Sequence, residues 1–192
     1  GKLVSRVMLI SVVICVVFGG TTLLLLYQNS MSFMQEEGDV SARAYSLAVQ
    51  NSLAKYATSV RSMAEDPSIF QEGLSKDLIQ QRLSFSAKAA GFQTAQVADI
   101  FGVTVDGKNI KDADYFTQAM KGKTYISSTG ADKTAPVTIA APVSSSTFTG
   151  VIACSLSIET MNDLVGYISI GKTGYGFLVD RDGTVLPDKH TA

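Results

Sequence analysis

A run of twenty residues without a charged side chain, from Val7 to Leu26, most constrains what this chain can fold into. A helix of that length, at about 1.5 Å per residue, spans roughly 30 Å, which is the thickness of the hydrocarbon core of a bilayer. Its most polar members are Ser11, Thr21 and Thr22, and their hydroxyls can hydrogen-bond to the helix itself. We therefore expect a transmembrane helix over residues 7–27.

The residues around this run favour a retained anchor over a cleaved signal peptide. A signal peptide has an apolar core of about 7–15 residues with a small-residue cleavage site close behind it, whereas the A-x-A-like site of this chain, Ala42 to Ala44, lies far beyond the run. Lys2 and Arg6 precede the run, and acidic residues follow it between positions 36 and 39. The positive-inside rule then places the N-terminus in the cytoplasm and the body of the protein outside the plasma or inner membrane.

Helical periodicity returns in three segments after the anchor. Small and apolar residues recur at three- and four-residue steps between Ala42 and Ala64, which predicts a long amphipathic stalk helix over 28–69 that Asp66-Pro67 ends. A second helix is predicted over 76–90, with Gly91 as its stop, and a third over 159–165.

The remaining pattern is that of short strands. We expect them over 93–97, 124–128, 136–143 and 148–157, with a Ser/Thr turn at 144–147 and a hairpin turn marked by Asp106-Gly107 within 103–110. These elements predict an α+β domain, an antiparallel sheet with helices on one side. A further strand–turn–strand is expected over 171–186, and a lone hairpin is marginally stable in water. Because the sequence also opens with Gly, we expect it to be a fragment of a longer protein.

Charge and reactive side chains narrow the function. The chain holds 16 Lys and Arg against 17 Asp and Glu, which excludes a strongly basic nucleic-acid binder. One histidine, His190, and two cysteines without a CxxC pair provide neither a multi-histidine metal site nor a disulfide framework, so we expect no metal and no cofactor. Asp112 and Asp114 lack a histidine, reactive cysteine or phosphate loop as a partner, so an enzyme within this chain is disfavoured.

Four stretches follow one another in a recognisable order. They are the anchor with a long helix ending in Ala64-Glu65-Asp66-Pro67, the segment 112–127 with its aromatic pair and Gly-Lys, the segments 140–143 and 150–156, and the segment 174–183. Together they resemble the extracytoplasmic sensor region of bacterial methyl-accepting chemotaxis receptors with a double Cache domain, two PAS-like modules stacked outside the membrane. The resemblance implies a membrane-distal Cache module over 28–168 and the start of a truncated membrane-proximal module at 169–192.

The function that this resemblance implies is transmembrane chemoreception. A homodimer would bind a small extracellular molecule and pass the signal across the membrane for chemotaxis. A histidine kinase or a cyclic-dinucleotide enzyme is the alternative output. A pilin-like structural protein is a further alternative, although the apolar run lacks the internal glutamate that such subunits carry.

The resemblance also implies a set of ligand-binding residues. Tyr115 and Phe116 fall where amino-acid-binding members place their aromatic pair, Asp132 matches an acidic position, and Ser155 stands where those members have a second acid. The arginine that precedes the aromatic pair is replaced by Ala113. A buried zwitterion needs a partner for each charge, so we expect an ordinary α-amino acid to be disfavoured and an amine, a purine-like compound or another small metabolite to bind. The structural alternatives are two core aromatics at the start of a helix and a solvated loop acid at Asp132.

Overall fold

The computed structural model describes residues 2–127, 137–165, 169–170, 174–175 and 179, with the backbone alone for 2–14, 30–39, 165, 169–170 and 174–175. The chain divides into two compact units, residues 1–47 and 48–192.

The first unit consists of helix α1, which runs from Lys2 to Ala64 and continues into the second unit. Thr21 and Thr22 donate hydrogen bonds to the carbonyls of Val17 and Phe18, at 2.9 and 2.8 Å. The hydroxyls are thus bonded to their own helix, as expected. Among the described residues, none of the helices has an apolar stretch of the length needed to cross a bilayer. The transmembrane role of 7–27 therefore stays a prediction.

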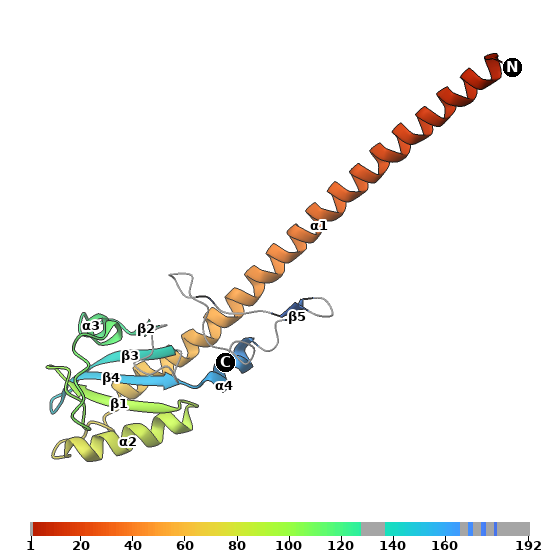
Figure 1. Ribbon diagram of the computed structural model, residues 1–192. Coiled ribbons are helices and arrows are strands. Elements are labelled where there is room, and N and C mark those ends of the chain that lie inside the picture. Colours follow the sequence, from red (N-terminus) through yellow and green to blue (C-terminus); the bar gives the residue numbers. More distant parts are fainter. Residues whose placement is uncertain (1, 128–136, 166–168, 171–173, 176–178, 180–192) are drawn as a thin grey trace. The chain divides into compact units, whose positions relative to one another are not determined.

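The second unit is built on a four-stranded antiparallel sheet with the order β1-β4-β3-β2 (Figure 1). Its strands are β1 (Thr94–Asp99), β2 (Tyr125–Ser127), β3 (Val137–Ser144) and β4 (Thr149–Leu156). The Ser145 hydroxyl closes the β3–β4 turn by accepting from the backbone N–H groups of Thr147 and Phe148. Each strand lies within a residue or two of its predicted position, and the predicted Ser/Thr turn is confirmed.

One face of the sheet is covered by the end of α1 and by α2 (Lys76–Ala89). Ser75 caps α2 by accepting from the N–H of Leu78, and Gly91 follows its end at φ 87°, a conformation that favours glycine. The buried stripe of α2 is Ile79, Leu83 and Ala87. Helix α1 ends at Ala64, before the predicted Ile69, because Pro67 disfavours helical backbone at Asp66.

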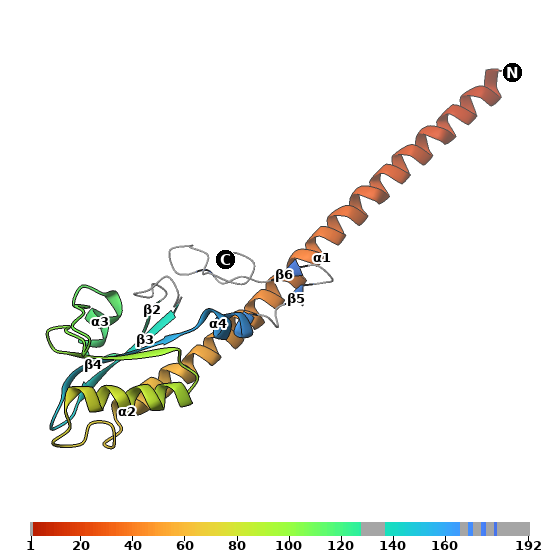
Figure 2. The same cartoon turned by 60° about the horizontal axis from the view of Figure 1, so that its bottom comes forward.

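The opposite face carries a short helix, α3 (Asp114–Ala119), so the prediction of helices on one side is wrong (Figures 1 and 2). The physical reason lies in the two central strands. Strands β3 and β4 bury apolar side chains on both of their faces. On the α3 side these are Ala140, Val151 and Ala153, which are as buried as their neighbours on the other face. A sheet that is apolar on both sides needs a cover on both sides.

The outer edge of β1 is closed by a side chain. The Gln80 amide of α2 donates to the carbonyl of Ala95 at 2.7 Å and accepts from the N–H of Val97 at 2.9 Å. It therefore occupies two of the backbone groups that an edge strand leaves open.

The segment after the sheet is described in part. Helix α4 (Ile158–Val165) agrees with the predicted helix, and β5 (Ser169–Ile170) pairs antiparallel with β6 (Gly174–Tyr175). Most of the predicted 171–186 hairpin lies outside the described residues. The division of the chain at 168 and 169 stays a prediction.

Candidate functional site

Helix α3 brings the predicted aromatic pair onto the sheet. Tyr115 and Phe116 are 2% and 3% exposed. They pack in a cluster on the α3 side of the sheet, which we call the α3-side cluster and which contains Ala98, Ile110, Tyr115, Phe116, Ala119, Ala140, Val151 and Ala153. The helix ends at Ala119, and the chain then turns at Gly122, whose N–H donates to the Ala119 carbonyl at 2.8 Å and whose φ is 84°. Both aromatics are therefore buried core residues at the start of a helix, as in the structural alternative predicted from the sequence.

The hydroxyl of Tyr115 differs from the rest of that side chain. It has no hydrogen-bond partner among the residues that the structure describes. In the same part of the chain, every side-chain nitrogen or oxygen closed off from solvent has a partner, so this hydroxyl must reach solvent. Burial raises the pKa of Tyr115, which keeps the phenol protonated. Tyr115 therefore offers a fixed, neutral donor at the boundary of a buried aromatic cluster.

A row of hydroxyl side chains crosses the same face of the sheet. The pairing register aligns Ser127 of β2 with Thr138 of β3, Thr138 with Ser155 of β4, and Ser155 with Thr94 of β1. The hydroxyls of Thr138 and Ser155 are 2.9 Å apart and hydrogen-bonded to each other. Ser127 and Thr138 are each 2% exposed, whereas Ser155 is half-buried and Thr94 is exposed. We call these four residues the hydroxyl row.

The hydroxyl row and the α3-side cluster are neighbours along the strands. Ser155 and Thr138 lie two residues from Ala153 and Ala140, and alternate residues of a strand share a face about 6.6 Å apart. Tyr125 pairs with Ala140 and packs against the cluster. The arrangement combines an aromatic wall with neutral donors and acceptors, which is the composition of a small-molecule site.

The predicted site residues are thus partly brought together. Tyr115, Phe116 and Ser155 lie on one face of the sheet, while Asp132 lies outside the described residues. Sequence reasoning missed Tyr125 and Thr138. Their alternation with Ser127 and Ala140 was visible, but the register that aligns them with Ser155 depends on pairing between distant segments.

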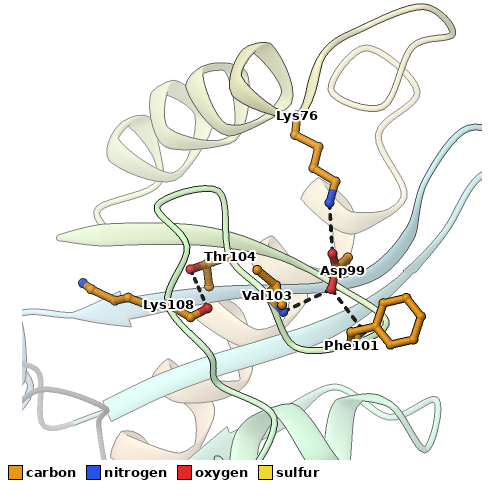
Figure 3. A network of polar contacts seen from close by, with 6 residues as sticks. All are labelled: Lys76, Asp99, Phe101, Val103, Thr104 and Lys108. Atoms are coloured by element: carbon orange, nitrogen blue, oxygen red, sulfur yellow. Dashed lines mark hydrogen bonds and ion pairs between the residues drawn. The ribbon is translucent and has the colours of Figure 1, made fainter.

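A polar network at the far end of β1 is structural (Figure 3). The Asp99 carboxylate accepts from Lys76 Nζ at 2.9 Å and from the N–H groups of Phe101 and Val103 at 3.0 and 3.1 Å. It ties α2 to the loop after β1. Next to it, the predicted 103–110 hairpin forms two isolated bridges and a turn at Gly107, without strands of its own.

The described residues contain no group of three or more metal-ligating side chains. No ion or cofactor chemistry is therefore assigned to this face of the sheet. What it can do chemically is bind a small molecule by stacking and hydrogen bonding.

Solved structures with the same fold are chemoreceptor sensor domains. The sensory domain of Campylobacter jejuni Tlp3 with isoleucine bound has a TM-score of 0.61 at 14% identity, covering 81% of this chain and 70% of that one. The ligand-binding domain of Pseudomonas fluorescens CtaA with L-serine gives 0.60 at 20% identity, covering 78% and 70%. That of Pseudomonas aeruginosa PctB with L-Arg gives 0.55 at 21% identity, covering 75% and 67%. At these identities the likeness establishes the fold.

These structures overturn the expectation that an ordinary amino acid is a disfavoured ligand, since amino acids are what the similar domains hold. The expectation relied on two missing charged side chains, at Ala113 and Ser155. Backbone N–H and C=O groups and hydroxyls also pair with the two ends of a zwitterion, so the loss of two side chains does not exclude this ligand class.

The family comparison covers nearly the whole chain. No curated protein sequence matches the chain significantly. The family model dCache_1, described as a Cache domain, matches residues 25–191. Since this match spans most of the 192 residues, the chain belongs to the Cache domain family.

Proposed function

We propose that this chain is the sensor region of a transmembrane chemoreceptor. We further propose that the α3-side face, which is the face of the sheet that carries the α3-side cluster and the hydroxyl row, binds an amino acid. Three findings support the proposal: the family match, the amino acids in the similar solved domains, and the composition of the α3-side face. Tyr115, Phe116, Ser155 and Asp132 are the proposed ligand-binding residues. No catalytic role is proposed for this chain.

The observation that carries the ligand site is the Tyr115 hydroxyl. Because this hydroxyl reaches solvent, water satisfies it in the free protein, and a ligand that accepts its hydrogen takes the place of that water. The ring is held in the α3-side cluster, so its position is set before any ligand arrives. A preformed donor of this kind favours binding because little order has to be gained.

The membrane part of the proposal rests on α1. Its described side chains between Val16 and Tyr27 include large apolar residues that are more than half exposed, among them Phe18 and Leu23. Apolar side chains in such a run are stable when an apolar medium surrounds them. We propose that residues 7–27 are this chain's membrane anchor, with a cytoplasmic N-terminus and the sensor outside. A homodimer and a chemotaxis output are part of the same proposal.

Thermal unfolding of the 192-residue chain in detergent, with each of the twenty common L-amino acids, tests the proposal. A ligand at a hundred times its Kd stabilises the folded state by about 2.7 kcal/mol, which raises Tm by roughly 5–10 °C for a chain of this size. At least one amino acid should give such a shift. The proposal fails if none does.

The matched variant is Tyr115→Phe. It keeps the ring in the α3-side cluster, and loss of one hydrogen bond should weaken binding about tenfold. Tyr115→Ala is unsuitable, because removing a buried ring costs about 3–5 kcal/mol and would unfold part of the population. Tyr56→Phe is the control, since Tyr56 packs against Phe92 on the opposite face and should leave binding unchanged.

A further inference from the structure

We propose that Thr147 and Phe148 of the β3–β4 turn hold Phe70 in the segment that follows α1, and that this contact makes the end of α1 move together with the β3–β4 hairpin. We call the three residues the Phe70 clamp. The inference goes beyond the proposed function, because it concerns how the sheet acts on α1 and not which ligand the domain binds. Its test needs no ligand.

The first argument is the way in which α1 packs on the sheet. Val60, Met63 and Ala64 lie in one buried apolar cluster with Ile139 of β3 and Ile152 of β4. Apolar contacts are non-directional, and packed helices shift by small sliding movements. Packing of this kind therefore permits small movements of the helix along the sheet. Directional contacts at the end of the helix restrict them.

The second argument is the hydrogen bonding of Phe70. Its N–H and that of Ile69 lie 3.4 and 3.2 Å from the Asp66 carbonyl oxygen, which is longer than the most common distance of about 2.9–3.0 Å. The Thr147 hydroxyl donates to the Phe70 carbonyl at 2.8 Å, across 77 positions of the sequence. The contact from the hairpin is therefore the shorter and better-formed hydrogen bond at Phe70.

The third argument is the ring of Phe70, which the same turn holds. Phe70 and Phe148 are 4% and 8% exposed, and their rings stack with centroids 5.7 Å apart and planes inclined by 19°. The Ser145 hydroxyl fixes Phe148 by accepting from its N–H at 2.9 Å and donating to its carbonyl at 3.1 Å. Both the backbone and the ring of Phe70 are thus attached to a turn of defined geometry. A shift of that turn moves Phe70 or breaks one of these contacts.

The fourth argument is the position of the hairpin in the fold. Strands β3 and β4 carry Ala140 and Val151 of the α3-side cluster on one face, and Ile139 and Ile152 against α1 on the other. The same two strands therefore connect the α3 side of the sheet with the Phe70 clamp. Helix α1 also contains the proposed membrane anchor. The clamp is thus the contact through which a shift of the hairpin acts on that helix.

Hydrogen exchange of the full chain in detergent, followed by mass spectrometry, tests this inference. Ser145→Ala loosens the turn by removing the hydroxyl that fixes Phe148. In the wild-type background it should raise the exchange rates of 144–149 and of 66–71 together, each by about twofold to tenfold, which is the effect of one lost hydrogen bond. In a Thr147→Val background the same substitution should raise exchange at 144–149 alone.

Matched variants control for the substitutions themselves. Thr147→Ser keeps the hydroxyl and should restore the joint response of the two segments. Thr58→Val removes an exposed hydroxyl that donates to the Ala54 carbonyl of its own helix at 2.9 Å, so it should leave the joint response unchanged. Exchange in β1 reports global unfolding. Where Ser145→Ala raises it too, Ser144→Gly, a milder change at an exposed position of the same hairpin, takes its place.

The outcomes decide the inference separately from the proposed function. If loosening the turn raises exchange at 144–149 and leaves 66–71 unchanged, the hairpin and the end of α1 move independently and the inference is wrong. It is also wrong if the joint response survives both Thr147→Val and Phe148→Leu. Loss of the joint response in either variant supports it. Because no readout involves a ligand, a failure of amino-acid binding would overturn the proposed function alone.

Discussion

At the scale of single residues, Asp99 shows how one carboxylate organises a loop. Burial acts to raise its pKa, but the hydrogen bonds from Lys76, Val103 and Phe101 outweigh burial and hold the pKa below the ordinary value of 3.8. The folded state thus binds its proton less readily than the unfolded chain does. The stability that Asp99 contributes is present above the unfolded-state pKa and is lost as the pH falls through the lowered folded-state pKa.

Asp99→Asn should remove this component of the pH dependence. We expect the free energy of unfolding of the wild-type chain to fall more steeply than that of the variant between about pH 5 and pH 3. Urea titrations at several pH values measure the difference, with Asp112→Asn, an exposed loop acid, as the control. Parallel curves for wild type and Asp99→Asn would contradict the assignment.

At the scale of elements, we expect the two hydrogen bonds of the Gln80 amide to stabilise the edge strand β1. Gln80→Ala leaves the Ala95 carbonyl and the Val97 N–H without their partner, and should lower the free energy of unfolding by about 1–3 kcal/mol. Gln80→Glu keeps the acceptor for the Val97 N–H but sets a carboxylate oxygen against the Ala95 carbonyl oxygen, so at neutral pH it should destabilise the chain at least as much as Gln80→Ala. Denaturant unfolding with Gln81→Ala, its exposed neighbour, as the control measures the effect. A loss no larger than that of the control would show that water replaces the amide.

The elements also show what sequence can reveal. The helix α2, the strands β1, β3 and β4 and the Ser145 turn follow from local periodicity and turn chemistry, and their bounds lie close to those predicted. Which face each strand presents, and that Thr138 meets Ser155, depends on register between distant segments. The apolar residues on both faces of β3 and β4 implied a second cover, and α3 was the element that sequence reasoning did not place on that face.

The candidate site, like the fold, was predictable only in its local features and not in the register that joins distant segments. The aromatic pair and Ser155 were predicted as ligand-binding residues through resemblance, and the structure places them on one face of the sheet; their role in binding stays a prediction. The ligand class was predicted wrongly, because the reasoning counted charged side chains and gave no weight to hydroxyls and backbone groups. Four hydroxyls from four strands form one row through pairing alone, which no single segment contains.

At the scale of the whole molecule, the apolar run of α1 decides whether the chain is held in a membrane. If residues 7–27 are an anchor, the full chain should remain with the membrane fraction after high-salt and alkaline washes, since neither disrupts apolar burial. Val17→Arg lies at the centre of this segment and adds a cost of about 2.5–3.5 kcal/mol. Leu24→Arg lies nearer its end and adds a smaller cost, and the double variant should move to the soluble fraction. Both positions are more than half exposed in the helix, so its fold should survive.

The control is Val40→Arg, on the same helix beyond the apolar run and likewise exposed. It adds a positive charge outside the run, so it should leave the distribution between fractions unchanged. Circular dichroism of the double variant keeps loss of the helix apart from loss of insertion. Release of the wild-type chain by the washes would contradict the anchor and would leave amino-acid binding by the α3-side face as a separate property, because the contacts that form that face lie within residues 98–155.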